Sequence, residues 1–515
     1  MSKAYLPLNK NKKIIFALLF TLFFIEIIRT AWICDDAKLT MRTVLNFIDG
    51  YGPRFNIDER VQVYTHPLWF LLLTGTTFIV RNIYVATFLT SISISAIVFW
   101  LFITKFSNKV LNIIVAAAAL ILSKSFIDFS TSGLENPLSY LLIILLVLSG
   151  EKVTTAKTPQ STLGYFFLCA LLYLCRPDLI LIVLPLTVFV TTTNIMPFHL
   201  FMRSLLIGTL PAIVWTIFSL YYYGFPFPNT AYAKLETGIP FGERIEQGII
   251  YLLDTVNRDP LTIVAIFTGI YLGIRKNTFA ACLSSGLILY LLYVISIGGD
   301  FMAGRFFAVP FLLACIQISR ADLNKVSLLV LAIGMGIFSS MNVQSTLLSN
   351  ASYKNEKISS NGITDERGFY FQQSGLLNLD RLTLSAPSWF RNGKVVVACG
   401  QLGARALQSE PSTHLVDSCA LADPLLSHIP ETQPAGKSMT WRIGHFYRRI
   451  PENYLKSIEL NTNLLVDPRL HAYYDSIRKV TRGDLNDPSR WMEIARINLE
   501  KPYINTLYMP RQLQP

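Results

Sequence analysis

Long runs of apolar residues recur along this chain, and they constrain its fold more than any other feature. Examples are IIFALLFTLFFIEII at 14–28 and NIIVAAAALIL at 112–122. Only 15% of the 515 residues are charged, whereas soluble domains average about 25%. This pattern excludes a cytosolic enzyme, a disordered protein and a disulfide scaffold. The sequence therefore predicts a polytopic α-helical membrane protein.

The formal net charge of +12 raises the question of a nucleic-acid partner. The sequence has no compact basic run with interleaved aromatic residues, so we expect no nucleic acid. Lys and Arg retained at the cytoplasmic ends of helices explain the charge instead. The first apolar run follows Lys10, Lys12 and Lys13 and continues without a small-residue cleavage site, which predicts a retained first helix.

The order of apolar runs and basic residues predicts the topology in a bacterial inner membrane. Basic residues mark the cytoplasmic side, which places the N-terminus inside. Residues 67–81 are expected to form a juxtamembrane or re-entrant segment, because a crossing there would put Lys152 and Lys157 outside. About eleven crossings remain, and several must extend into their flanks to reach the roughly 20 residues that a bilayer requires. They are expected at 14–33, 83–104, 110–123, 137–149, 163–175, 179–195, 204–223, 260–274, 279–297, 306–319 and 326–344.

This topology gathers most of the unusual polar residues on the periplasmic face. Because ionisable groups near the membrane are costly and usually functional, we expect one external site there. Its segments would be 34–66, 124–136, 176–178, 224–259, 298–305 and everything after about 346.

Hydropathy falls after residue 345, which predicts a membrane module at 1–345 and a soluble periplasmic domain of mixed α/β character at 346–515. Within that domain KVVVACG (394–400) indicates a buried strand followed by a turn. The spacing of Cys399 and Cys419 permits a disulfide in an oxidising compartment, and two free thiols fit the sequence equally well. No cysteine or histidine spacing indicates zinc.

The strongest local signal is Asp35-Asp36, just beyond the first helix, with YTHPLW (64–69) and its His66 further along. Adjacent carboxylates at a membrane surface are costly unless they hold a cation, a metal or a substrate hydroxyl. A solvated helix end is the alternative interpretation.

Four further motifs fall on the same predicted face. In SGLENP (132–137), Glu135 fits either a site or the acidic residue that a helix N-terminus favours. Arg176-Pro177-Asp178 fits a site or a salt-bridged hairpin equally well. PFPNTAYAK (226–234) brings Asn229, Tyr232 and Lys234, and GGDFMAGRF (298–306) brings Asp300 and Arg305. A lysine or arginine here could bind a phosphate, or the charges could merely neutralise one another. Polar residues also gather in the external domain at Asp417, Asp423, Arg442 and His445.

In this combination and order, the motifs resemble one family of membrane glycosyltransferases. They are DDAKLTMR, GYG..FN..ERV, YTHPLW, SGLENPL, RPD, PNT.Y.K and GGD…RF, followed by CG.LG, D.CALADPLL and WRIGHF…P..Y. The family is that of the terminal β-(1→2)-arabinofuranosyltransferase (AftB-like) of mycobacterial arabinan synthesis. The chain is also similar to the related LphB-like and pilin-arabinosylating membrane proteins of Gram-negative bacteria.

The resemblance implies the GT-C fold, whose first external loop carries the catalytic carboxylate, and a polyprenyl-phosphate sugar donor such as decaprenyl-phosphate arabinofuranose. The acceptor would be a cell-envelope glycan, a lipopolysaccharide or a pilin. Direct displacement would invert the anomeric centre, with Asp35 or Asp36 as the general base. Lys234 and Arg305 are the preferred ligands of the departing phosphate, followed by Arg176, His66, Asn229 and Tyr232. Glu135, Asp178 and Asp300 would orient donor hydroxyls or hold a divalent cation, and the sequence leaves Mg²⁺ or Ca²⁺ undecided.

Two other classes of function remain open. A transporter or flippase for a lipid-linked sugar would show inverted repeats and discontinuous helices, and neither is visible in the sequence. A structural or assembly factor would not need carboxylates at the membrane surface. Within the enzymes, a GT-C protein that uses another lipid-linked sugar would share this architecture.

Overall fold

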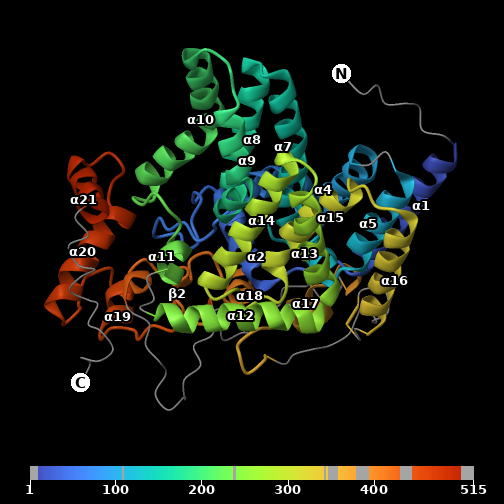
Figure 1. The fold of residues 1–515 in the computed structure, drawn as a ribbon. Coiled ribbons are helices and arrows are strands. Elements are labelled where there is room, and N and C mark those ends of the chain that lie inside the picture. The colour runs from blue at the N-terminus through green and yellow to red at the C-terminus, as the bar shows by residue number, and fades with distance from the viewer. Residues whose placement is uncertain are drawn as a thin grey trace.

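The computed structural model describes residues 10–106, 109–235, 239–341, 344–345, 358–378, 394–429 and 444–499. Within these ranges the chain is mostly helical, with one pair of short strands. Long helices stand side by side in a bundle, and later parts of the chain lie along its lower end and left flank (Figure 1).

Every expected span corresponds to a helix of the bundle. By length and composition, α4, α7, α10 and α14 could each cross a membrane, and seven shorter apolar helices accompany them. The protein is therefore helical with candidate membrane spans, and the number of crossings stays a prediction. The bundle helices are α1 (Lys10–Arg29), α4 (Ile83–Lys105), α5 (Val110–Leu122), α7 (Asn136–Ala156), α8 (Pro159–Cys175), α9 (Ile180–Thr192), α10 (Phe198–Tyr222), α13 (Pro260–Ile274), α14 (Thr278–Ser296), α15 (Ala308–Ser319) and α16 (Lys325–Met341).

The segment expected to lie at the membrane surface forms the helix α3 (Pro67–Val80). A helix of 14 residues is about 21 Å long, shorter than the roughly 30 Å hydrocarbon core. Near its start Trp69 donates a hydrogen bond to Gly133 O (3.0 Å), and Thr87, in the second turn of the next helix, lies against the same glycine. The start of α3 and the second turn of α4 therefore lie at one loop, and whether α3 crosses stays a prediction.

Short helices fill the lower end between the bundle helices. One of them, α2, begins where Cys34 Sγ accepts a hydrogen bond from Ala37 N, and Asp35 and Asp36 occupy its first turn. Acidic side chains there favour the positive end of the helix dipole. These elements are α2 (Asp35–Ile48), α6 (Lys124–Asp128), η1 (Pro177–Leu179), α11 (Asn229–Leu235), α12 (Phe241–Arg258) and η2 (Arg305–Phe307).

The C-terminal region contains the predicted strand. β1 (Val395–Ala398) pairs in parallel with β2 (His414–Asp417), and Gly400 takes a positive φ of 81° in the turn that follows β1. Cys399 and Cys419 form a disulfide, with their Cα atoms 5.3 Å apart. The remaining elements are α17 (Glu366–Ser374), α18 (Leu402–Gln408), η5 (Leu426–His428), α19 (Tyr454–Glu459), α20 (Pro468–Arg482) and α21 (Pro488–Leu499).

Packing continues across the predicted domain border at 345/346. Ile363, Tyr370 and Phe371 belong to the same hydrophobic core as the bundle helices. Beside them Lys124 Nζ lies 3.1 Å from Asp365 Oδ1, and Arg367, fully buried, pairs with Asp128 at 3.2 Å. Residues 358–378 thus pack as part of the bundle, while a second core gathers around β2 and α19 to α21. The division into two domains stays a prediction.

Candidate active site

The two adjacent carboxylates that open α2 have different surroundings. Asp35 is buried, and its carboxylate accepts hydrogen bonds from Gly403 N (2.9 Å) and Ala404 N (2.8 Å). Those N–H groups belong to the first turn of α18, where they have no partner inside the helix. Asp35 therefore acts as a cap from a distance and holds α18 against α2.

Asp36 is only partly buried, and its carboxylate makes no hydrogen bond to any residue that the structure describes. Burial raises the pKa of Asp36, Lys234 and Arg305 oppose that rise, and Asp35 and Asp300 add to it. The resulting pKa lies above that of an ordinary aspartate. A carboxylate of this kind can accept a proton from a bound hydroxyl.

Glu135, at the start of α7, is the centre of a buried charged cluster. Its Oε1 lies 3.1 Å from Arg305 Nη2 and 3.7 Å from Arg176 Nε, and its Oε2 lies 3.2 Å from His66 Nδ1. Burial alone would raise the pKa of Glu135, but Arg305, His66 and Arg176 hold it well below its usual range. We call these four residues the Glu135 cluster. Charge neutralisation of this kind is what allows a carboxylate to remain ionised in the interior.

Both arginines of the cluster have a second carboxylate. Arg176 pairs with Asp178 at 2.5 Å, and the hydroxyl of Tyr290 accepts a hydrogen bond from Arg176 Nη2 and donates one to Asp178 (both 2.8 Å). Arg305 Nη1 lies 3.5 Å from Asp300. Even so, Arg305 Nε and Arg176 Nη1 are buried without a hydrogen-bond partner among the described residues.

Lys234, at the end of α11, is the second cation, beside Arg305, whose charge acts on Asp36. Gly444, from the C-terminal region, adopts a positive φ of 75° and approaches both Phe301 and the Lys234 ammonium. The next residue, His445, packs edge-on against Phe301, with ring centroids 4.6 Å apart. The C-terminal region therefore supplies one wall of this site. Arg442, which belongs to the same motif, lies outside the described residues.

Two predicted donor ligands lie apart from the cluster. Asn229 Nδ2 donates hydrogen bonds to the carbonyl oxygens of Ala420, Leu421 and Asp423 at 3.0–3.1 Å, and its Oδ1 accepts one from Ser427. Its amide is therefore fully used in holding the 420–427 segment. Tyr232 packs against the rings of Phe225 and His428. Neither residue is brought to the Glu135 cluster.

The acidic residues of the C-terminal region have structural partners. Asp417 accepts hydrogen bonds from the backbone N–H groups of Cys419, Leu421 and Ala422, and burial raises its pKa to about 6. Asp423 accepts from Leu425 N, Leu426 N and the hydroxyl of Tyr454. These carboxylates order the loop that follows β2.

The described residues contain no group of three or more His, Cys, Asp or Glu side chains arranged to hold a metal ion. Near Asp36 and Glu135 the acidic groups face Lys234, Arg176 and Arg305, which repel a divalent cation. The arrangement fits an anion that is bound by protein cations.

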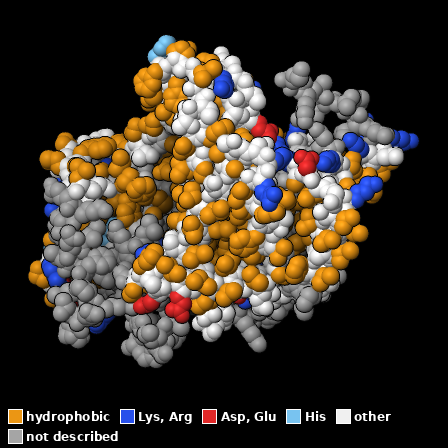
Figure 2. All heavy atoms as spheres, in the orientation of Figure 1, with side chains coloured by type: hydrophobic (Ala, Val, Ile, Leu, Met, Phe, Trp, Pro, Cys, Tyr) orange, Lys and Arg blue, Asp and Glu red, His pale blue; other side chains and the backbone are white. Residues whose placement is uncertain are grey.

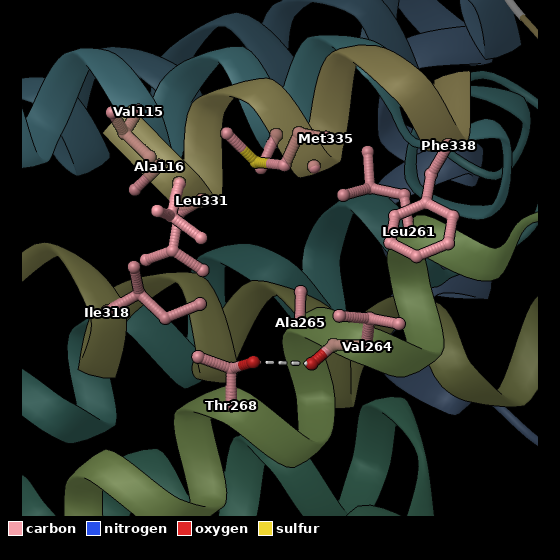
Figure 3. Close-up of a pocket in the computed structure, with 13 residues that line it drawn as sticks. Val115, Ala116, Leu261, Val264, Ala265, Thr268, Ile318, Leu331, Met335 and Phe338 are labelled. Atoms are coloured by element: carbon pink, nitrogen blue, oxygen red, sulfur yellow. Dashed lines mark hydrogen bonds between the residues drawn. The ribbon is translucent and has the colours of Figure 1, made fainter. Parts of the chain in front are cut away.

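A separate cavity of about 210 Å³ lies among α5, α13, α15 and α16 (Figure 3). Its lining is apolar except for Thr268, whose hydroxyl donates to Val264 O in its own helix (2.8 Å). It therefore offers no chemistry for a sugar or a phosphate.

Some contributors to the site were not singled out from the sequence. Tyr290 bridges Arg176 and Asp178, and Thr40 Oγ1 lies 2.9 Å from His66 Nε2. Tyr251 holds the segment on both sides of Arg305. The available signal was a hydroxyl inside an apolar or amphipathic helix, because a buried tyrosine hydroxyl usually finds a hydrogen-bond partner.

Two known proteins are similar in sequence to this chain. No model of a known protein family matches the chain. The chain is 31% identical over 340 residues to a terminal β-(1→2)-arabinofuranosyltransferase from Corynebacterium glutamicum, an alignment that covers 57% of this chain and 48% of that protein. It is 28% identical over 324 residues to the Mycobacterium tuberculosis protein of the same name, covering 54% and 51%. The chain thus spans about half the length of these curated relatives, and over that part it is related to terminal β-(1→2)-arabinofuranosyltransferases.

Proposed function

We propose that this protein is an inverting membrane glycosyltransferase of the GT-C type. It transfers a sugar, arabinofuranose, from a polyprenyl-phosphate donor to a hydroxyl of a cell-envelope glycan or glycoprotein. The observation that carries the proposal is the Asp36 carboxylate, which has no hydrogen bond to a described residue and feels the charges of Lys234 and Arg305. A base beside two cations is what transfer from a lipid phosphate requires.

The proposed reaction is a displacement at the anomeric carbon. The acceptor hydroxyl attacks this carbon and transfers its proton to Asp36. The bond between the anomeric carbon and the phosphate oxygen breaks, and the lipid phosphate leaves with the electron pair. Arg305 and Lys234 stabilise the charge that develops on that oxygen, because a preorganised cation contributes most where charge appears in the transition state.

The Glu135 cluster orients the Arg305 and Arg176 guanidinium groups for phosphate binding. Glu135 holds the Arg305 and Arg176 guanidinium groups in place while one N–H of each stays without a partner among the described residues. A phosphate bound beside them could accept from these donors. His66, fixed between Thr40 and Glu135, completes this wall of the site.

The nature of the sugar and of the acceptor rests on the relatives. Both are named terminal β-(1→2)-arabinofuranosyltransferase, which supports arabinofuranose as the sugar and an envelope glycan as the acceptor. The apolar bundle supports a lipid-linked donor that diffuses in the inner membrane. The distribution of basic residues supports a site on the periplasmic face.

The test is transfer of radiolabelled arabinose by the purified protein from synthetic polyprenyl-phosphate arabinofuranose to a simple arabinoside acceptor. Wild type should transfer the label, and Asp36→Asn should lose at least about 100-fold in rate, as expected for a general base. Transfer at the wild-type rate by a correctly folded Asp36→Asn protein would rule out Asp36 as the base. If wild type fails with this donor and succeeds with another lipid-linked sugar, the enzyme class stands and the sugar is wrong.

The product of the same assay reports the stereochemistry. A single displacement with Asp36 as the base inverts the anomeric configuration, which proton NMR of donor and product distinguishes. Retention of configuration would instead require a carboxylate nucleophile or attack from the side of the leaving phosphate, and would exclude the displacement described above.

A further inference from the structure

Helix α12 has an apolar stripe on the face that points away from the protein. Ile249, Leu253 and Val256 are 45%, 59% and 40% exposed, and their spacing of four and three residues places them on one side of the helix. The opposite side, with Gly248 and Tyr251, is buried against the bundle. Apolar side chains thus occur on both faces, and only one face has a partner within the described residues.

The stripe is continuous with the apolar surface of neighbouring bundle helices. Phe267 on α13 and Leu292 on α14 are 54% and 58% exposed. Figure 2 shows hydrophobic side chains covering this face and continuing down to the level of α12, where acidic side chains appear. α12 runs across the lower ends of α13 and α14 (Figure 1), and it is separated from the start of α13 only by Asp259. Such a helix lies where a bilayer that surrounds the bundle would end.

The buried face of α12 holds the segment that carries Arg305. The hydroxyl of Tyr251 donates to Met302 O (2.9 Å) and accepts from Phe306 N (3.2 Å). Its ring stacks on Phe307, with centroids 5.2 Å apart. Contacts on both sides of Arg305 therefore come from one side chain of α12.

The same contact is enforced by a glycine in the segment. Gly299 adopts a positive φ of 74°, and a side chain there would collide with the Tyr251 ring. Met302 and Phe306 cannot move relative to the helix without breaking a hydrogen bond to Tyr251. The position of Arg305 is consequently tied to the position of α12.

We propose that α12 is an interfacial helix whose Ile249–Leu253–Val256 stripe lies in the boundary between lipid headgroups and acyl chains, and that Tyr251 transmits this position to Arg305. Amphipathic helices bind in that plane with their apolar face buried several ångströms below the headgroups. A lipid phosphate lies at the same level, so the helix sets Arg305 at the depth of the donor phosphate. This second part rests on the proposed function.

The lipid contact is tested without any enzymatic reaction. The purified protein is reconstituted in bilayers containing a phospholipid with a photoactivatable diazirine in its acyl chain. Trypsin cleavage after Arg244 and Arg258 releases the stripe as one peptide, 245–258. We expect lipid adducts on Ile249, Leu253 and Val256. Labelling of Phe267 on α13 without labelling of the stripe would overturn the proposal. It would mean that water or another protein, and not lipid, covers the stripe.

The link to Arg305 is tested with variants in the transfer assay. Leu253→Glu should lose the adducts and raise KM for a long-chain donor presented in bilayers roughly tenfold, while KM for a short-chain donor in detergent stays unchanged. Leu253→Met, which keeps the stripe apolar at the same position, is the matched control and should behave as wild type.

Tyr251→Phe separates the two halves of the proposal. It removes both hydrogen bonds but keeps the ring, so adducts on the stripe should persist while kcat/KM falls roughly tenfold with both donors. Unchanged kcat/KM in this variant would exclude Tyr251 as a positioning residue. If wild type transfers no sugar but the stripe is labelled, the interfacial helix stands and the proposed function fails.

Discussion

At the scale of single residues, Asp35 and Asp36 are neighbours with different roles: Asp35 caps α18, and under the proposed function Asp36 is the base. Because Asp35 caps α18, Asp35→Asn should keep most of the transfer activity, since its amide oxygen can still accept from one of the two N–H groups, Gly403 N or Ala404 N, which bind different carboxylate oxygens of Asp35. Asp35→Ala should lower stability by about 1 kcal/mol. Parallel measurement of thermal unfolding and transfer rate checks this. A loss of activity in stable Asp35→Asn as large as that in Asp36→Asn would contradict the division of roles.

Lys234 opposes the rise in the pKa of Asp36 that burial causes. Burial raises the pKa of Asp36 and Lys234 is the strongest group opposing it. A base must be ionised to act, so kcat/KM should fall as the pH drops through this pKa. Lys234→Met removes a positive charge, raises the pKa further and should move the acidic limb to higher pH. Lys152→Met, on the far side of the molecule, should leave the acidic limb of the kcat/KM profile in place. If the acidic limb does not move in Lys234→Met, Lys234 does not influence the pKa of Asp36.

Glu135 is the residue whose loss should be felt most in stability. It is buried beside Arg305, Arg176 and His66, so Glu135→Gln removes the carboxylate that the two arginines share and leaves each with one acidic partner, Asp300 or Asp178. Removing one partner of a buried ion pair typically costs about 3 kcal/mol. Because its folded-state pKa is lowered, this stabilisation is present above the ordinary glutamate pKa and is lost only as the pH falls through the lower folded value. Unfolding of the detergent-solubilised protein at neutral pH should show the loss, and the exposed Glu246→Gln should not.

At the scale of elements, α18 is fixed to α2 at both of its ends. Asp35 caps its start, and Arg42, seven residues further along α2, donates to Ala406 O at 2.5 Å and to Thr413 O at 3.1 Å beyond its end. Arg42→Met removes several charged hydrogen bonds, each worth about 1.5–3 kcal/mol. We expect faster limited proteolysis within 394–429 and a lower transfer rate. Equal protease resistance of Arg42→Met and the surface control Lys456→Met would show that the clamp is dispensable.

The same elements show which parts of the site could be predicted from the sequence and which could not. Local motifs singled out Glu135, Arg176, Asp300 and Arg305, because charged residues beside apolar runs are conspicuous, and the structure brings these four side chains together. The separate role of Asp35 was not predictable, since its partners lie 368 and 369 residues away. Asn229 was predicted to bind the donor for a similar reason. The sequence places its amide in a loop, but in the structure the amide donates to carbonyl oxygens of a segment about 190 residues away.

At the scale of the whole molecule, the arrangement of α3 bears on the topology. If α3 does not cross, the chain crosses eleven times, with the N-terminus in the cytoplasm and the C-terminal region outside. A membrane-impermeant maleimide should then label Arg81→Cys and Lys456→Cys in intact cells and Lys157→Cys only after permeabilisation. Arg81→Cys labelled only after permeabilisation would make α3 a true span and reverse the side of everything that follows.

The cap on α18 has a consequence for how the protein matures. Side chains of consecutive helical residues point about 100° apart, so fixing Asp35 also fixes the direction of Asp36. The residues that fix it, Gly403 and Ala404, are synthesised 368 and 369 residues after Asp35. In a nascent chain the membrane helices would therefore be in place before the direction of the Asp36 side chain is fixed. Under the proposed function, such a chain would not consume donor until the C-terminal region had reached the same side of the membrane and folded.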